Sequence, residues 1–450
     1  MNKNYIPQAF YLTLAIVIIF SLLSFINLDA FSVGVPLKEV NLYADILSDA
    51  KQQDQLQQQS EIKKIKLASI DKSCPPNTVC FQNFTSEKFP LDPFLSNLLE
   101  AKEGKSKVRI AWFGDSFSEA DIVVGNLRDT LQCLFGGNGV GFLPITSEAP
   151  GFRRTVVHNF GGWKTNSIIT NPRDGKLGIN GYSYKPDSAN YFTFSGTNNF
   201  KHTRSFSTFR LFYSSRRDIH SSIVFNRKDS RSIILPASDS PTMLTLKASN
   251  IRKVWASIAD TSALRCYGAS LEDETGVYID NFSVKGNSGL GLLSISRRNF
   301  AKFDSLLNYN LIVLQFGLNV TNPNAKNFND YIQGMTRLVK RLKVAFPETP
   351  ILLLSVSDRC TRKLGEFVTM PVIPRLIMAQ EKIAYDNKLL FWNLFEAMGG
   401  ENSMAKFVSS KPSLANKDYT HLNFAGGRKI GLSMARSFVY EVDKYKERKK

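Results

Sequence analysis

The sequence predicts an α/β fold in three layers, in which a parallel sheet is covered by helices on both faces. Apolar runs of strand length alternate with amphipathic helical stretches on either side of the middle of the chain, and this alternation is typical of parallel sheets. The middle instead carries short aromatic and β-branched runs broken by Gly, Asn, Asp and Ser, which favours an inserted all-β, jelly-roll-like domain. An apolar N-terminal segment adds a predicted membrane-spanning helix.

The chain opens with an uncharged apolar segment, AFYLTLAIVIIFSLLSFINL, over residues 9–28. Its length suits a membrane span better than the apolar core of a signal peptide, and no convincing small-residue cleavage site follows. Because Lys3 precedes the segment, the rest of the chain is expected outside the cytoplasm. We therefore expect residues 1–28 to be a signal anchor in the inner membrane and the remainder to be periplasmic, in the cell envelope. The alternative is a secreted protein whose signal is cleaved.

Four segments follow this anchor. Residues 29–95 are polar, include KQQDQLQQQSEIKKIK and have little to bury, so they predict a stalk or linker. Residues 96–147 and 282–450 are the two parts of the α/β domain. Residues 148–281 are the inserted β-sandwich, a candidate carbohydrate-binding module.

The α/β domain begins with a strand, a tight turn and a helix. VRIAWF (108–113) is a mostly apolar strand, and Gly114-Asp115-Ser116 follows it at once. The next helix has on one face Val124, Leu127, Leu131 and Leu134. The same alternation returns after residue 300, and the expected strands and helices are Leu311–Phe316, Tyr331–Phe346, Ile351–Val356, Arg375–Asp386, Leu389–Trp392 and Ala425–Lys444.

The chain is strongly basic, with 57 Lys and Arg against 39 Asp and Glu and a formal net charge of +18. This charge favours anionic surroundings such as nucleic acid, anionic lipid or acidic cell-wall polymers, and it is equally compatible with a solvated basic surface. No zinc-finger, RNP-type or basic-zipper signature accompanies the charge, so we expect no nucleic-acid partner.

Five cysteines are too few for a disulfide scaffold. Cys74 and Cys80 bracket a Pro-Pro-Asn turn, and a bridge between them and two free thiols are equally compatible with the sequence. Cys133, Cys266 and Cys360 lie in apolar or strand-like contexts, which predicts small buried side chains.

Ser116 ends a strand and precedes a helix, so its side chain is expected at the carboxyl edge of the sheet, where open α/β folds place their sites. A helix beginning beside Ser116 would offer unsatisfied N–H groups and a favourable dipole to an oxyanion. By itself the tripeptide is also compatible with a simple helix cap.

A second group of chemical interest lies immediately before the last predicted helix, at Asp418-Tyr419-Thr420-His421. The spacing lets Asp418 hold one ring nitrogen of His421 while the other nitrogen faces Ser116, the arrangement that deprotonates a hydroxyl. The alternative is an N-capping Asp with an exposed His. The other histidines, His158, His202 and His220, show no metal-ligand spacing and no Cys accompanies them, so we expect neither a catalytic metal nor a cofactor.

These segments resemble, in chain order, the four sequence blocks of the SGNH/GDSL hydrolase family. The matching residues are Gly114-Asp115-Ser116, Gly286-Asn287-Ser288-Gly289, Phe316-Gly317-Leu318-Asn319 and Asp418-x-x-His421. The likeness covers about 108–145 and 282–445 and implies a flavodoxin-like SGNH sheet. It implies Ser116 as nucleophile, His421 and Asp418 as its partners, and an oxyanion hole formed by the N–H groups of Ser116 and Gly289 and the amide of Asn319. A loop glycine and a strand-ending turn are the alternatives for Gly289 and Asn319.

A narrower likeness is to bacterial peptidoglycan O-acetylesterases, which carry a carbohydrate-binding-like β module between the first and second blocks. Phe391-Trp392-Asn393 and Ala397-Met398-Gly399-Gly400 also resemble that subgroup. Phe117 departs from it, because those relatives commonly carry His after the nucleophile. The likeness implies a serine esterase that removes O-acetyl groups from a cell-envelope carbohydrate, peptidoglycan above all. The alternatives are an O-acetyltransferase with a membrane partner and a non-catalytic wall-binding protein.

The β block contains side chains suited to a glycan. Aromatic residues that either stack on sugar rings or pack in the core, the interpretation we favour, are Trp163, Tyr182, Tyr184, Tyr191 and Tyr213. Basic residues that suit acidic groups are Arg216, Arg217, Arg227, Lys228 and Arg231.

Overall fold

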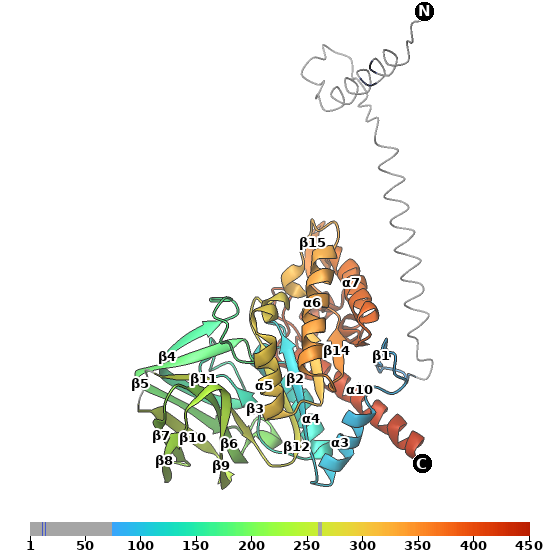
Figure 1. The fold of residues 1–450 in the computed structure, drawn as a ribbon. Coiled ribbons are helices and arrows are strands. Elements are labelled where there is room, and N and C mark those ends of the chain that lie inside the picture. Colours follow the sequence, from blue (N-terminus) through green and yellow to red (C-terminus); the bar gives the residue numbers. More distant parts are fainter. Residues whose placement is uncertain (1–10, 12–13, 15–73, 260–262) are drawn as a thin grey trace, which may run out of the picture. The chain divides into compact units, whose positions relative to one another are not determined.

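The computed structural model describes residues 11, 14, 74–259 and 263–450 (Figure 1). The described residues from 74 onward belong to one compact unit, Ser69–Lys450, with a mixed α/β fold. The predicted span over 9–28 lies outside the described residues except for Tyr11 and Leu14. Among the helices that the structure describes, none is long and apolar enough to cross a bilayer.

The centre of the unit is a sheet whose strands are β1 (Gln82–Asn83), β2 (Lys107–Gly114), β12 (Gly276–Ser283), β13 (Leu311–Gln315), β14 (Ile351–Leu354) and β17 (Leu390–Trp392). Their order is β1-β17-β14-β13-β2-β12. Neighbours from β12 to β17 run parallel, and β1 pairs antiparallel with β17 at the edge. In chain order the parallel strands are arranged 2-1-3-4-5, the flavodoxin-like order. All residues of β13, β14 and β17 are buried, because helices lie on both faces.

Two groups of helices cover the sheet. α3 (Asp92–Lys102), α4 (Val124–Phe135) and α10 (Phe424–Lys449) pack together, and α5 (Arg297–Leu307), α6 (Asn329–Ala345) and α7 (Val372–Asp386) form the second group. The chain crosses from β2 to β12 in one direction and from β12 to β17 in the other, so right-handed crossovers put α4 and α5–α7 on opposite faces. Short elements are η2 (Glu119–Asp121), η4 (Leu290–Ser294), η5 (Leu318–Val320), β15 (Cys360–Lys363), β16 (Glu366–Thr369), α8 (Leu394–Met398) and α9 (Ser403–Ser409).

The predicted apolar face of α4 is wrong at its last position. Val124, Leu127 and Leu131 are buried, but Leu134 is 41% exposed. Phe135 faces the core in the last turn instead, with 5% of its surface exposed.

The inserted block between α4 and β12 is all-β (Figure 1). Its strands are β3 (Gly141–Leu143), β4 (Val156–Ser167), β5 (Tyr182–Gly196), β6 (Phe206–Ser215), β7 (Ile219–Phe225), β8 (Asp229–Leu235), β9 (Ser238–Ile251), β10 (Lys253–Ile258) and β11 (Leu264–Glu272). Hydrogen bonds join the strands of the predicted β-sandwich into one sheet. The sheet curls around a shared core. Phe209 of β6 and Phe225 of β7 meet there, with ring centroids 6.1 Å apart, although their strands are not paired.

The predicted domain boundaries differ from the observed ones. The insertion begins before residue 148, because β3 pairs with β11, and it ends before 281, because β12 pairs with β2 along its whole length. The predicted stalk over 29–95 also extends too far. Phe81 and Leu95 are buried at 6% and 0% exposure, and the two-residue strand β1 is too short to leave a recognisable pattern.

The cysteines fall into three environments. Cys74 and Cys80 form a disulfide. Cys266 and Cys360 are buried as predicted, whereas Cys133 is exposed. The prediction for Cys133 is wrong because it lies on the outer face of α4, opposite the side that packs on the sheet.

A buried charge network joins the insertion to the parallel sheet. Arg109 of β2 donates to Asp280 of β12 at 2.8 Å and also to Glu272, the last residue of β11. Tyr309 donates to Asp280 at 2.8 Å. Burial by itself would raise the pKa of Glu272, but the nearby cations Arg109, Lys107 and Arg210 outweigh it and hold that pKa at about 2. The network therefore anchors the last strand of the insertion where it enters the sheet.

Candidate active site

Ser116 lies just beyond the carboxyl end of β2, which ends at Gly114. β2 lies between β12 and β13 in the sheet. The strand order reverses at β2, and open α/β folds place ligands at the carboxyl end of the strands where this happens. Gly114 has little room, since a Cβ at this position would come within 2.6 Å of the Ser283 hydroxyl and 3.0 Å of the Gln315 amide oxygen. The missing side chain lets three strand ends converge beside Ser116.

The prediction that a helix begins beside Ser116 is wrong, because α4 begins only at Val124. Ala120 and Asp121 have φ of 53° and 63°, a left-handed conformation that an α-helix excludes. The Asp121 carboxylate accepts from Arg128 at 3.1 Å and from Arg153 at 2.8 Å. Burial opposes its charge, but the two arginines outweigh burial and hold the pKa of Asp121 well below its ordinary value. α4 therefore begins only after this turn and not beside Ser116.

Ser116, His421 and Asp418 form a continuous hydrogen-bonded chain. Ser116 Oγ lies 2.9 Å from His421 Nε2, across 305 sequence positions. His421 Nδ1 lies 2.8 Å from Asp418 Oδ2. An ionised carboxylate only accepts, so Nδ1 carries the proton and the Nε2 lone pair faces the serine hydroxyl. Such a chain can activate Ser116 as a nucleophile.

The Asp418 carboxylate is held in its charged form. Burial raises its pKa, but hydrogen bonds from the backbone and side chain of His421 and the backbone of Thr420 outweigh burial, so the pKa of Asp418 lies below its ordinary value. The two backbone N–H groups reach Asp418 Oδ1 at 3.0 Å each. One oxygen of Asp418 therefore shapes the turn and the other orients the imidazole.

The loop before α10 fixes His421. Tyr419 has a φ of 54°, and its ring stacks on Phe367 at a centroid distance of 3.6 Å. Asn416 N–H donates to the His421 carbonyl at 2.9 Å. Asn423 caps α10 by accepting from the N–H groups of its first turn. The loop is thus tied to the hairpin β15–β16 on one side and to α10 on the other.

Glycines at the start of α10 bring this loop to Ser116. A Cβ at Gly427 would overlap the Ile122 carbonyl, and one at Gly431 would lie 2.8 Å from the Val123 carbonyl. The backbone of α10 therefore packs directly on the segment that follows Ser116. The short sequence FAGGRKIG carries this signal, which sequence analysis did not use.

The candidate oxyanion-hole residues already have hydrogen-bond partners in this structure. Gly289 N–H donates to Asn287 Oδ1 at 3.0 Å. The Asn319 amide donates to the Asn287 carbonyl at 3.0 Å and to Asp115 Oδ2 at 3.4 Å. Gly289 has a φ of 94°, and a Cβ there would lie 2.9 Å from Met335 Sδ, so this position requires glycine.

Asp115 and Gln315 are site residues that sequence analysis did not assign. Asp115 is fully buried and accepts from Phe117 N–H at 3.0 Å and from Gln315 at 3.2 Å. Burial raises the pKa of Asp115 to about 6. Gln315 also accepts from the Ser118 hydroxyl at 2.7 Å. The available signal was one polar residue at the end of an otherwise apolar strand, LIVLQ.

A cavity of about 320 Å³ lies beside the site, between the strand ends and the insertion. Ser283, which pairs with Gly114, and Glu119 form its wall on the hydrolase side. On the insertion side it is lined by Trp163 and Tyr182. Burial and then Glu148 raise the pKa of Glu119, while Lys285 and His421 oppose them.

The other predicted residues of the β block divide between core and surface. Tyr184 and Tyr213 are buried in the core at 0% and 2% exposure, and Tyr191 is 38% exposed. Among the basic residues, Arg231 pairs with Asp229 at 2.6 Å. Those with exposed side chains are Arg216, Arg217, Arg227 and Lys228.

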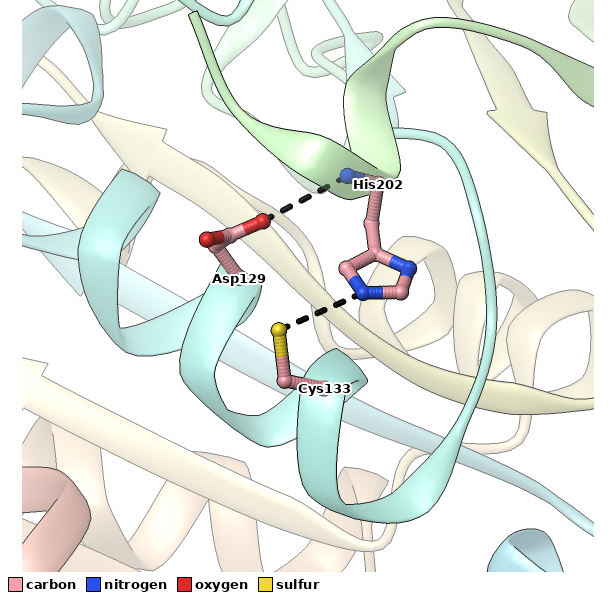
Figure 2. A group of neighbouring side chains, drawn as sticks. All are labelled: Asp129, Cys133 and His202. Carbon is pink, nitrogen blue, oxygen red and sulfur yellow. Dashed lines mark hydrogen bonds between the residues drawn. The ribbon is translucent and has the colours of Figure 1, made fainter.

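The remaining histidines lie in different surroundings. Burial lowers the pKa of His158 to about 4, and its ring bonds the Ile145 carbonyl at 3.0 Å. His220 is exposed. No Cys lies near these histidines along the sequence, but the fold brings Cys133 Sγ to within 3.3 Å of His202 Nε2 (Figure 2). The two residues are 69 positions apart, so ligand spacing along the sequence could not reveal them.

A scan against protein-family models and a search of curated proteins both give no match. Among solved structures, a peptidoglycan O-acetylesterase is 18% identical, with a TM-score of 0.67 over 81% of this chain and 99% of that one. A protein assigned as a GDSL-like lipase from Parabacteroides merdae is 13% identical, with a TM-score of 0.27 over 36% and 73%. A family two carbohydrate esterase from Cellvibrio japonicus is 9% identical, with a TM-score of 0.25 over 64% and 98%. The last two scores are low, so the fold comparison depends on the first structure. The chain is thus similar in fold to that peptidoglycan O-acetylesterase.

Proposed function

We propose that the protein is a serine esterase that removes O-acetyl or similar short acyl groups from a cell-envelope carbohydrate, peptidoglycan above all. The observation that carries this proposal is the chain of contacts from Ser116 Oγ through His421 to Asp418, at 2.9 and 2.8 Å. These contacts support a Ser-His-Asp triad as the proposed catalytic arrangement.

The proposed reaction is two-step acyl transfer. His421 takes the hydroxyl proton as Ser116 Oγ attacks the ester carbonyl, and Asp418 stabilises the imidazolium that forms. The tetrahedral intermediate collapses when His421 returns this proton to the sugar oxygen, which leaves as the alcohol. Water, deprotonated by the same imidazole, then releases the acyl group from Ser116. No step needs a cofactor.

The oxyanion would be held by the Ser116 N–H, by the Asn319 amide, and by the Gly289 N–H, which would exchange its hydrogen bond to Asn287 Oδ1 for one to the oxyanion. The Asn319 hydrogen bond to Asp115 is long, at 3.4 Å, and therefore weak. We infer that this amide hydrogen turns to the oxyanion when an ester binds. Asp115 acts as a positioning residue, because it orients both the turn at Ser116 and the Asn319 side chain.

The substrate class is proposed from the fold and the cavity. The structure with the high TM-score is of a peptidoglycan O-acetylesterase. The cavity lined by Glu119 and Ser283 also presents Trp163 and Tyr182, and partly buried aromatic side chains with a polar group suit the mixed apolar and hydroxylated surface of a sugar. A periplasmic location behind an N-terminal anchor would place the site next to the cell wall.

The test measures acetate release by purified full-length protein from 4-nitrophenyl acetate and from O-acetylated peptidoglycan. We expect Ser116→Ala to lose about 10⁴- to 10⁶-fold in turnover on both substrates. Ser305→Ala, an exposed serine on α5, is the matched control and should be unchanged. Equal acetate release by the parent and Ser116→Ala would exclude Ser116 as nucleophile. Release of 4-nitrophenol that requires a sugar acceptor and leaves the acetyl group on that sugar, without free acetate, would instead favour an O-acetyltransferase.

A further inference from the structure

Three potential metal ligands meet where the insertion contacts α4 (Figure 2). Asp129 and Cys133 lie one turn apart on the outer face of α4. His202 belongs to η3 (Lys201–Thr203), in the connection between β5 and β6. One ligand atom from each residue lies within 4.8 Å of the others, and none of the three takes part in the proposed ester chemistry.

The orientation of the His202 ring is determined by two further side chains. Asp273 Oδ2 accepts from the Asn138 amide nitrogen at 2.7 Å, which directs the amide oxygen of Asn138 toward His202 Nδ1, 3.1 Å away. Nδ1 therefore carries the proton, and the Nε2 lone pair points at Cys133 Sγ, 3.3 Å away. Carboxylate or amide partners of this kind commonly fix the outer nitrogen of metal-binding histidines.

We propose that Asp129, Cys133 and His202 bind a divalent transition-metal ion of the zinc type. On a tetrahedral zinc ion with ordinary bond lengths, sulfur and nitrogen ligands are about 3.5 Å apart, close to the 3.3 Å between Cys133 Sγ and His202 Nε2. Asp129 is partly exposed and can supply a carboxylate oxygen by a side-chain rotation. The fourth position faces solvent and takes water. The Cys133 proton is released to solvent when the metal binds.

The Cys133–His202–Asn138 arrangement resembles that of a nucleophilic cysteine. The charges around Cys133 favour a bound cation instead. Cys133 lies in the last turns of α4, where no basic side chain offsets the negative end of the helix dipole. A bound cation would neutralise the Asp129 carboxylate and the Cys133 thiolate together.

The bound metal would join the insertion to the hydrolase domain. In the structure His202 N–H approaches Asp129 Oδ1 at 3.4 Å, and Gly139 N–H donates to the His202 carbonyl at 2.7 Å. These contacts already hold η3 against α4. A metal that bridges 69 positions of chain would stabilise the folded state by an amount that grows with the logarithm of the free metal concentration above its dissociation constant.

The test measures the reactivity of the Cys133 thiol. Cys133 is exposed, whereas the other two free cysteines, Cys266 and Cys360, are buried. Full-length protein is treated with chelator and then with an aromatic disulfide reagent in increasing zinc chloride. At a zinc concentration ten times the dissociation constant, we expect the fast thiol reaction to slow about tenfold. Cobalt chloride should give a thiolate-to-cobalt absorption band in the near ultraviolet. Cys133→Ser should remove both the fast reaction and the band.

The variants decide between a built site and incidental binding. His202→Gln should abolish zinc protection while leaving Cys133 reactive, and the control His220→Gln, which changes an exposed histidine, should retain full protection. Protection that is absent from the parent, or equal in His202→Gln and the parent, would overturn the proposal. Ester turnover that survives in Ser116→Ala and is lost in Ser116→Ala/Cys133→Ser would also overturn it, by making the thiol a nucleophile.

Discussion

Replacement of Asp418 by Asn tests the orientation of the catalytic imidazole separately from the stability of its loop. The Asn oxygen can still accept the N–H groups of Thr420 and His421, which reach Asp418 Oδ1 at 3.0 Å. The Asn nitrogen would face His421 Nδ1, now 2.8 Å from Asp418 Oδ2. Since this nitrogen donates, Nδ1 must accept, and Nε2 then carries the proton. The imidazole could no longer deprotonate Ser116.

The magnitude follows from the exposure of Asp418. In a buried triad this change lowers turnover about 10⁴-fold. The Asp418 side chain is 48% exposed, so water can replace part of its contribution. We expect kcat/KM to fall about 10²- to 10⁴-fold, which corresponds to about 3–5 kcal/mol of transition-state stabilisation.

The assay is hydrolysis of 4-nitrophenyl acetate by full-length protein, with thermal unfolding measured in parallel. The control is Asp443→Asn, an exposed carboxylate on α10 that pairs with Lys446 at 3.2 Å. We expect the melting temperatures of both variants to stay close to that of the parent. If Asp418→Asn retains more than about a tenth of the parent kcat/KM while folded, the assignment of tautomer and role is wrong.

Three further substitutions probe the site and its support. Asn319→Ala should lower kcat about 10²- to 10³-fold with little change in KM in steady-state assays, and an unchanged kcat would remove Asn319 from the oxyanion hole. Burial raises the pKa of Asp115 from 3.8 to about 6, so the folded protein retains a proton that the unfolded chain releases. The stability of the parent relative to Asp115→Asn should therefore be greatest below pH 4 and fall by up to about 3 kcal/mol as the pH rises through 6, and a pH-independent difference in denaturant titrations would contradict this. Arg109→Met leaves the buried carboxylates of Asp280 and Glu272 without their main cation, and should reduce the free energy of unfolding by about 3–5 kcal/mol in urea titrations. A loss below about 1 kcal/mol would show that other groups stabilise these two carboxylates without Arg109.

The sequence was informative where burial or chemistry is local. β13, β14 and β17 are buried along their whole length, and strands of this kind leave continuous apolar runs. β12 was missed because its sequence, GVYIDNFS, contains the polar residue Asp280. The partners of Asp280 are Arg109, Tyr309 and the Phe142 N–H, all from other elements. Likewise, an isolated Asp115 gives no sign that it will be buried.

What the sequence determined by itself is the position along the chain of the apolar strands β2, β13, β14 and β17 and the short segments that carry Ser116, Asn319 and the Asp418–His421 pair, because each depends on residues close to one another. Only the tertiary structure decided that Ser116 and His421 meet across 305 positions, that α4 begins beyond the turn after Ser116, and that Cys133 lies against His202. These outcomes depend on close backbone packing, such as that of Gly427 on Ile122, and on left-handed residues in the turn after Ser116. Packing between distant segments leaves no periodic pattern in a single sequence, so the physical fit of the folded chain had to be known.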